Sequence, residues 1–354
     1  MSHDSVLILR NDANVAVGTG HVMRCLALAQ AWQDEGGRAV FAMAELPASL
    51  RRRLLSEGME VVNLTVSPGS AHDAKAVIDS CRERGASWVI VDGYQFDADY
   101  QRALKSANLR LLLIDDNGRA GHYSADLVLN QNAHAREDLY SDREAQTRLL
   151  LGTRYVMLRR EFQSWRNWKR KIAPVARKIL VTMGGSDPDN VTARVIEALS
   201  LVQLDGLEVR IVAGCSNPHF ELLQQLAGRG RGSVQLLKDV SNMPELMAWA
   251  EITIIAAGGT LWEALFMGCS VMSYARNSIQ QASVAELDRA GAVFDLGHPQ
   301  ASNAATLASV LAGLAASYKD RLRMCARGRE QVDEKGAART CQVLMQQPVL
   351  NLRQ

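Results

Sequence analysis

A histidine stands where a glycine turn leads into a helix, in the segment RNDANVAVGTGHVMRCLALAQAW at residues 10–32. The apolar run at 6–9 predicts a buried strand, and apolar residues from Val22 onward recur at helical spacing. Between them, Gly18 and Gly20 permit a tight turn and the close approach of a ligand to the backbone. The unpaired N–H groups of a first helical turn favour an anion at this place.

His21 is the side chain at this turn that can exchange a proton near neutral pH. A histidine beside an anion site suggests chemistry on a phosphorylated or nucleotide-linked substrate. A Gly-x-Gly turn is a weak motif, and an equally good interpretation is that His21 merely caps the helix. The segment by itself leaves both interpretations open.

Other polar residues and glycine turns also follow predicted strands. In the first half these are Asp92, Gly93 and Tyr94, then Asp115 and Asp116, then Asn130, Gln131 and Asn132. In the second half they are the turns Gly184-Gly185-Ser186 and Gly258-Gly259-Thr260, with Glu263 one turn into the following helix. Backbone amides at such turns suit a diphosphate, and a carboxylate one turn in suits ribose hydroxyls. Taken singly, Asp92, Asp115 and Asp116 more often end strands or cap helices. Gly258-Gly259 alone could be a packing turn, and Glu263 could be an ordinary exposed helix residue. Their joint placement therefore carries the argument.

Short β-rich runs alternate with helical stretches, which predicts parallel β-α-β units. The β-rich runs fall at 5–10, 38–43, 59–64, 87–93, 109–116 and 126–132, and then at 178–185, 207–214, 233–239, 252–259, 270–275 and 292–297. We therefore predict an α/β fold with two doubly wound, Rossmann-like parallel sheets. Ligands bind beyond the carboxyl ends of such strands, so we expect the two domains to face each other across a cleft.

A chain of 354 residues is expected to form two domains. We predict an N-terminal catalytic domain at 1–170 and a C-terminal domain with the last helices at 171–354. The join is expected around 158–177, a basic segment with two tryptophans that reads as a linker helix docked on a domain, with a membrane or nucleic-acid element as the less favoured interpretation.

The composition limits the class of protein. With 40 Lys and Arg against 38 Asp and Glu, the charge is close to balanced, so we expect no nucleic-acid partner. No apolar run approaches the roughly 20 residues that span a bilayer, and we expect no stable membrane association. The N-terminus lacks the features of an export signal and the six cysteines are dispersed, so we expect a cytoplasmic location. The spacing of His, Asp and Glu predicts no metal site, and we expect no cofactor.

Taken in order, several motifs resemble the PseG/SpsG family of UDP-sugar hydrolases. They are R-x-D followed by GTGHVMRCLALA, then D-x-Y, IDD, LNQN, GGSDPDN and AGGTLWE, and they run from Arg10 to about Gly291. The family is similar to the two-domain GT-B glycosyltransferases. The resemblance implies a GT-B-like fold, with UDP in the C-terminal domain and water as the acceptor. It also implies removal of UDP from UDP-2,4-diacetamido-2,4,6-trideoxy-β-L-altropyranose for pseudaminic acid or a related nonulosonate.

The resemblance assigns roles position by position. His21 would be the general base that activates water for inverting attack on the anomeric carbon. Tyr94 would orient the water or a phosphate oxygen, and Asp12 would hold either His21 or a sugar substituent. The substrate and UDP contacts would come from Arg10, Gly20, Gly184, Gly185, Ser186, Val240, Gly258, Gly259, Thr260, Glu263 and Gln280.

The chain departs from the family pattern in its second half. An Asn-Gln pair is usual there, and counting back from Gly291 gives Ile279 and Gln280, with Asn277 two residues earlier. The usual Gly-x-Pro is Gly268-Cys269-Ser270, and the usual Ser before Thr260 is Gly259. These departures leave the identity of the sugar open.

Two alternatives remain beside the hydrolase. A GT-B-like glycosyltransferase would pass the sugar to another acceptor and should show an acceptor groove or an apolar patch on the N-terminal domain. The loop at 10–21 offers no obvious patch of this kind. A nucleotide-sugar-binding scaffold would bind UDP without turnover, and His21 beside an intact glycine turn argues against it.

Overall fold

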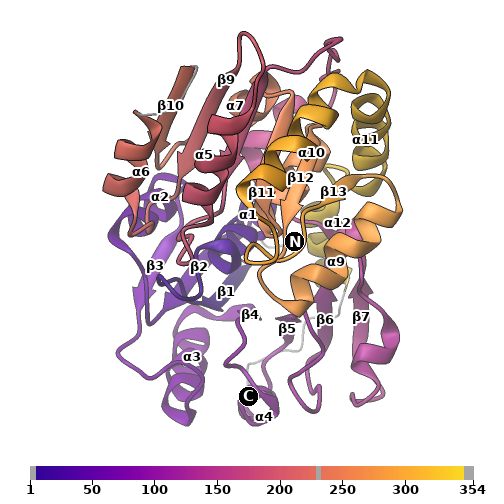
Figure 1. Cartoon of the computed structure of the whole chain (residues 1–354). Coiled ribbons are helices and arrows are strands. Elements are labelled where there is room, and N and C mark those ends of the chain that lie inside the picture. The colour runs from indigo at the N-terminus through magenta and orange to yellow at the C-terminus, as the bar shows by residue number, and fades with distance from the viewer. Residues whose placement is uncertain (1–4, 229–232, 347–354) are drawn as a thin grey trace. The chain divides into compact units, whose positions relative to one another are not determined.

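The computed structural model describes residues 5–228 and 233–346 of the chain (Figure 1). Taken over these residues, the chain splits into two compact units, one of residues 5–160 with 335–346 and the other of residues 161–228 with 233–334. Each unit is built on one parallel β-sheet. The prediction of two α/β units with doubly wound sheets is confirmed.

The boundary of the units differs from the expected division after residue 170 in two respects. Residues 161–170 belong to the second unit, where the Arg170 guanidinium donates to the backbone carbonyls of Met247 and Met267. The last helix, α12 (Gly336–Gln346), returns to the first unit. Its Leu344 carbonyl accepts a hydrogen bond of 3.1 Å from the Trp88 indole, and its apolar side chains complete the core there.

The sheet of the first unit has the strand order β3-β2-β1-β4-β5-β6-β7, and all neighbouring strands are parallel. The strands are β1 (Val6–Asn11), β2 (Arg38–Met43), β3 (Glu60–Asn63), β4 (Ala86–Asp92), β5 (Leu111–Ile114), β6 (Leu127–Asn130) and β7 (Arg148–Leu151). The helices are α1 (Gly20–Asp34), α2 (Ala48–Ser56), α3 (Ala71–Arg84), α4 (Ala98–Ser106) and α12, with short 3-10 turns η1 (Glu137–Tyr140) and η2 (Thr153–Tyr155). Strand β7 was not among the predicted strands.

Strand β1 shows why the first sheet forms where it does. Its sequence VLIL has no polar alternation because both faces are covered, as is usual in parallel sheets. Leu7 and Leu9 pack into one core cluster with α1, while Val6 and Ile8 pack into another with α3 and α4. Strand β1 is therefore packed on both faces, and the loop that follows it leads to His21 in the first turn of α1.

The sheet of the second unit has the order β10-β9-β8-β11-β12-β13, again parallel throughout. Its strands are β8 (Lys178–Thr182), β9 (Glu208–Ala213), β10 (Ser233–Lys238), β11 (Ile252–Ala256), β12 (Ser270–Tyr274) and β13 (Val293–Asp295). The helices are α5 (Val191–Leu201), α6 (Phe220–Ala227), α7 (Met243–Trp249), α8 (Gly259–Phe266), α9 (Ser278–Arg289), α10 (Ala304–Ala316) and α11 (Tyr318–Gln331). The join is the 3-10 turn η3 (Arg160–Trp165) followed by irregular chain at 166–177, not the helix that was expected.

In both sheets the order in which successive strands are added reverses between the first and the fourth strand of the unit. This point lies between β1 and β4 in the first sheet and between β8 and β11 in the second. The connections after these two strands cover opposite faces, so their loops separate and leave room for a ligand at the carboxyl edge. The residues that follow β1, β4, β8 and β11 are therefore the first to consider as a site.

Candidate active site

His21 lies in the first turn of α1, directly after the loop that leaves β1. Gly18 takes a positive φ of 79°, and both its N–H and that of Val17 bind Asn14, which closes the loop. Thr19 occupies the N-cap position without a side-chain hydrogen bond, and the first turn holds no acidic residue. The positive end of α1 is thus left without a carboxylate of its own, as an anion site requires.

The imidazole of His21 is held by Asp92, the last residue of β4. The two are joined by a contact of 2.6 Å between His21 Nδ1 and Asp92 Oδ1. Asp92 is fully buried and lies opposite Asn11 in the register of β1 and β4. A carboxylate on Nδ1 fixes the ring and leaves the lone pair of Nε2 for a substrate proton.

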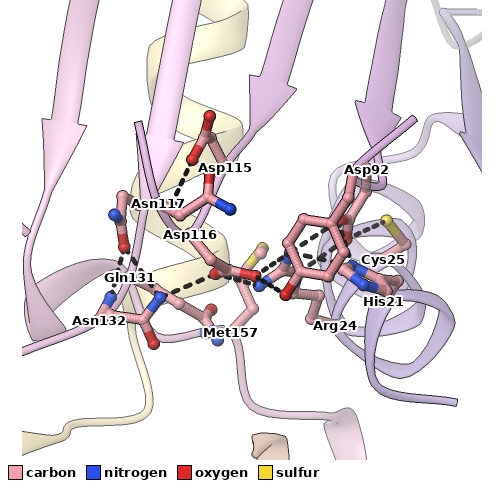
Figure 2. Close-up of polar contacts among 12 residues, drawn as sticks. His21, Arg24, Cys25, Asp92, Asp115, Asp116, Asn117, Gln131, Asn132 and Met157 are labelled. Carbon is pink, nitrogen blue, oxygen red and sulfur yellow. Dashed lines mark hydrogen bonds and ion pairs between the residues drawn. The ribbon is translucent and has the colours of Figure 1, made fainter. Parts of the chain in front are cut away.

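Arg24, one turn further along α1, joins Asp92 to a second carboxylate. Its Nε and Nη2 donate to Asp92 at 2.7 and 2.6 Å. Its Nη1 and Nη2 donate to Asp116, which follows β5, at 2.7 and 3.0 Å. Burial by itself would raise the pKa of each carboxyl group, but the charge of Arg24 outweighs it and lowers both pKa values. Figure 2 shows this arrangement beside His21.

Tyr94 and Asn132 complete the site around Asp116. The Tyr94 ring meets the His21 ring edge to face, with 5.1 Å between the centroids, and its hydroxyl donates to Asp116 Oδ2 at 3.4 Å. Partial burial and the charge of Asp116 raise the pKa of Tyr94, so the phenol stays protonated. Asn132, after β6, donates to Asp116 Oδ1 at 2.8 Å. The ring of Tyr94 remains largely exposed and able to contact a ligand.

Asp12 and Arg10 lie apart from this arrangement. The carboxylate of Asp12 accepts the N–H groups of Ala44 and Glu45 at 2.8 and 3.0 Å and pairs with Arg10 at 2.7 Å. Asp92, and not Asp12, therefore holds His21, while a contact of Asp12 with a sugar substituent stays a prediction. The Arg10 guanidinium is completely buried and donates twice to Asp73 at 2.8 Å, so this structure offers it no contact with a substrate. Arg10 thus joins β1 to α3, and Asp12 joins the chain after β1 to the chain after β2.

Sequence reasoning had placed Asp92 and Asp116 at strand ends but gave neither a partner, and it missed Arg24 altogether. The signal for Arg24 was its position three residues after His21, on the same side of the helix. Asp115 has a different role from its neighbour, since it accepts hydrogen bonds from the Tyr123 hydroxyl and the N–H of Gly118. Of the adjacent pair of aspartates, the second alone belongs to the site.

The turn after β8 carries the first group of predicted UDP contacts. Gly184 takes a positive φ of 85°, and a Cβ on Gly214 would lie 2.4 Å from the carbonyl oxygen of Gly185. Ser186 is buried. The carboxylate of Asp187 accepts the N–H groups of the first residues of α5 at 2.9 and 3.0 Å. The amino end of α5 is thus satisfied by the protein itself, and UDP contacts by this turn stay a prediction.

The turn after β11, unlike the turn after β8, leads into a helix whose amino end has no side-chain cap. Gly258 is the N-cap of α8 and makes no side-chain cap, and the first turn holds no acidic residue. A Cβ built on either Gly258 or Gly259 meets nothing within 4 Å. Thr260 is half-buried and Glu263 is buried one turn in. The open, uncapped end of α8 matches the anion site that the sequence predicts here.

The remaining predicted contacts follow two other strands of the second unit, with Val240 after β10 and Gln280 in the first turn of α9, after β12. Val240 is half-buried and follows Asp239, whose φ is 49°. The Asn277 side chain caps α9 by accepting the N–H of Gln280, and the side-chain Oε1 of Gln280 in turn accepts the N–H of Arg276 at 2.9 Å. The side chain of Asn277 is therefore used as the cap of α9. A role for it in place of the family's asparagine stays a prediction. A role of Val240 or Gln280 with UDP stays a prediction.

Over 5–228 and 233–346, no group of three or more His, Cys, Asp or Glu residues is arranged to hold a metal ion. Over the same ranges, no helix has the length and apolar character needed to cross a membrane.

Comparison with known proteins finds relatives of low identity, and no protein-family model matches the chain. The spore coat polysaccharide biosynthesis protein SpsG of Bacillus subtilis is 24% identical over 336 residues, covering 94% of this chain and 96% of the relative. The UDP-2,4-diacetamido-2,4,6-trideoxy-β-L-altropyranose hydrolase of Campylobacter jejuni is 24% identical over 283 residues, covering 78% and 94%. An uncharacterized protein of Methanocaldococcus jannaschii, MJ1062, is 25% identical over 276 residues, or 76% of this chain. The chain spans about half (55%) of the length of that last relative.

Solved structures resemble the whole fold. MurG of Acinetobacter baumannii matches with a TM-score of 0.63 at 14% identity, covering 97% of this chain and 100% of that one. A putative UDP-N-acetylglucosamine 2-epimerase of Listeria monocytogenes matches with a TM-score of 0.70 at 13% identity, covering 96% and 95%. With a doubly wound parallel sheet in each of its two units, the chain has a GT-B-like fold.

Proposed function

We propose that the protein is a UDP-sugar-processing enzyme, and specifically a hydrolase that removes UDP from UDP-2,4-diacetamido-2,4,6-trideoxy-β-L-altropyranose. The Campylobacter jejuni relative carries the name of this activity, and SpsG is named for polysaccharide biosynthesis. The observation that carries the proposal is the imidazole of His21, fixed by Asp92 at the reversal point of the first sheet. We place the reaction in nonulosonate biosynthesis, and its cytoplasmic location stays a prediction.

His21 acts as the general base in this proposal. Its Nδ1 is bound to Asp92, its side chain is 9% exposed, and among the described residues no hydrogen bond to Nε2 is found. Nε2 therefore takes a proton from water while the water oxygen attacks the anomeric carbon from the side opposite the diphosphate. The bond between that carbon and the diphosphate oxygen breaks, and its electron pair leaves with UDP. The free sugar has inverted configuration.

The leaving diphosphate needs positive charge or N–H donors that are already in position. We assign this task to the amino end of α8, where Gly258, Gly259 and Thr260 present an open and uncapped backbone. Glu263 would bind the ribose hydroxyls. The proposal assigns UDP binding to the second unit and the general base, His21, to the first.

One observation favours the alternative of a glycosyltransferase. The sequence suggested no apolar patch in the loop after β1, yet the side chains of Val15 and Val17 are 50% and 41% exposed there. Two exposed valines close to His21 could receive an apolar acceptor. The hydrolase is preferred because the relative with a named reaction is a hydrolase.

Release of UDP tests the proposal. The purified protein is incubated with the diacetamido-trideoxy-altrose nucleotide or with UDP-GlcNAc, and UDP is measured with and without added acceptors. We expect release from the first substrate without an acceptor, loss of release in His21→Gln, and unchanged UDP binding in that variant. The matched control is His122→Gln, which changes an exposed histidine held by Asp142 and Glu144. Release that depends on an acceptor would establish the transferase, and tight UDP binding without release would establish a scaffold.

A further inference from the structure

Arg24 is the cation between the two buried carboxylates of the site, and one of these carboxylates holds His21. Figure 2 shows its side chain reaching between Asp92 and Asp116. The Arg24 side chain is 11% exposed, Asp92 is 0% exposed and Asp116 is 10% exposed. Arg24 Nη2 also lies 3.1 Å from His21 Nδ1, so the two groups converge on the same oxygen of Asp92. Arg24 and His21 therefore share one carboxylate.

The charge of Asp92 can be compensated either by Arg24 or by a protonated His21. A buried carboxylate with no other cation stabilises a protonated imidazole beside it, because the charged pair compensates for the loss of water around both groups. A protonated His21 could not accept a proton from water. With Arg24 bound to it, Asp92 already has its compensating charge and needs from His21 only a hydrogen bond.

Asp116 keeps Arg24 in this place. It accepts two hydrogen bonds from Arg24 and is itself held by Asn132 at 2.8 Å and by the Tyr94 hydroxyl at 3.4 Å. A guanidinium bound to two carboxylates through its planar fork has little freedom to turn. The positive charge is thus fixed beside Asp92.

Cys25 and Tyr94 also lie around His21 and Arg24, and neither adds charge to this balance. The Cys25 thiol faces Asp92 Oδ2 at 3.5 Å, and burial raises its pKa far above the usual range, so it stays neutral. Tyr94 also stays protonated, because burial and Asp116 raise its pKa. His134 faces the backbone carbonyl of Asp116 at 3.1 Å. The charges that act on His21 at close range are those of Arg24, Asp92 and Asp116, together with the positive end of α1.

We propose that Arg24 is a positioning residue that neutralises Asp92 and so keeps His21 unprotonated near neutral pH, with Asp116 as the anchor of Arg24. This inference rests on the assignment of His21 as the base in the proposed function. It can be tested without turnover, however, because it concerns the proton equilibrium of one imidazole.

The experiment follows the histidine signals by NMR in the full chain labelled with ¹³C at the histidine ring, as a function of pH. His21→Gln identifies the His21 signal. In Arg24→Gln we expect its titration midpoint to rise by about 1 pH unit or more. Arg24→Lys, which keeps the charge, should restore most of the wild-type midpoint. Arg102→Gln, which removes an exposed arginine of α4, is the matched control and should change nothing.

Arg24→Gln leaves two buried carboxylates without their cation and could fail to fold. The double variant Arg24→Gln/Asp116→Asn retains one of the two carboxylates, and its His21 midpoint should still lie above that of the wild type. A midpoint that is unchanged or lower in both the single and the double variant would overturn the inference. Should the protein release no UDP at all, the proposed function fails while this titration still decides the role of Arg24. Where UDP is released, the acid limb of the pH–rate profile should move in the same directions.

Discussion

His21 and Asp92 lie 71 residues apart in the chain, and their side chains meet at 2.6 Å. They meet because β1 and β4 are neighbours at the reversal point of the first sheet, where Asn11 and Asp92 stand side by side. The loop after β1 then delivers the first turn of α1 to the end of β4. A proton acceptor and the carboxylate that fixes it thus come from the two strands whose loops separate around a ligand.

Asp92→Asn should remove most of the activity while UDP binding is kept. An asparagine can no longer accept the Nδ1 proton with a full charge, so the ring loses its orientation and its correct tautomer. We expect kcat to fall about 100-fold to 10,000-fold, the usual range for a general base. The measurement is the rate of UDP release together with UDP affinity by calorimetry. A variant that retains wild-type kcat would show that Asp92 does not serve His21.

Asp116→Asn should change stability in a manner that depends on pH. The pKa of Asp116 is lowered in the folded protein, because the charge of Arg24 outweighs the effect of burial. Its ionised form therefore stabilises the fold above the unfolded-state pKa of about 3.9, and this contribution declines as pH falls from there toward the folded-state pKa. We expect the difference in Tm between wild type and variant to be constant from pH 6 to 8 and to narrow below about pH 4.

Asp79→Asn is the control for this titration, because Asp79 forms an exposed pair with Lys75 on α3. Thermal unfolding of all three proteins is followed by circular dichroism over the same pH range. A difference for Asp116→Asn that grows toward acid pH would contradict the assigned sign.

Asp73→Asn should destabilise the first unit without changing UDP binding. Asp73 is fully buried, accepts two hydrogen bonds from Arg10, and also accepts from Gly69 N–H and the Tyr100 hydroxyl. Its loss leaves the buried Arg10 without its main partner, which typically costs about 3–5 kcal/mol. Lys75→Ala, in the exposed pair, should cost less than about 1 kcal/mol. Denaturant unfolding measures both, and a loss of UDP affinity in folded Asp73→Asn would restore a ligand role for Arg10.

The arrangement of strands was accessible from the sequence because apolar runs of four to six residues alternate with helical patterns. His21 could be placed at the end of a strand for the same reason. The partner of His21 could not, because the choice between Asp12 and Asp92 depends on which strand lies beside β1 and on which way each carboxylate points. The backbone N–H groups of Ala44 and Glu45, which bind Asp12, belong to a loop whose position only the folded sheet defines.

The role of Arg24 and the position of α12 are two further features that the sequence alone did not predict. An arginine on an amphipathic helix looks like any solvated residue until the carboxylates of two other strands are placed around it. The last helix has an apolar face that could cover either sheet, and the local pattern does not indicate which. Only the packing of Cys341 and Leu344 into the core of the first unit assigns α12 to it.

Gly259→Val should weaken UDP binding without weakening the fold. A Cβ at this position meets nothing within 4 Å, so the side chain would enter the open space in front of α8, where we place the diphosphate. We expect at least a tenfold loss of UDP affinity and an unchanged Tm. Gly313→Ala, at an equally open position inside α10, is the matched control and should leave UDP affinity unchanged. Wild-type affinity in Gly259→Val would move the diphosphate away from this turn.

The most direct test of the central claim is the position of the oxygen atom that water contributes. The diacetamido-trideoxy-altrose nucleotide is hydrolysed in H₂¹⁸O, and both products are analysed by mass spectrometry. Attack on the anomeric carbon by water activated at His21 predicts ¹⁸O in the free sugar and none in UDP. Label in UDP would mean attack at phosphorus and would contradict the assignment of His21 as the base for attack at carbon.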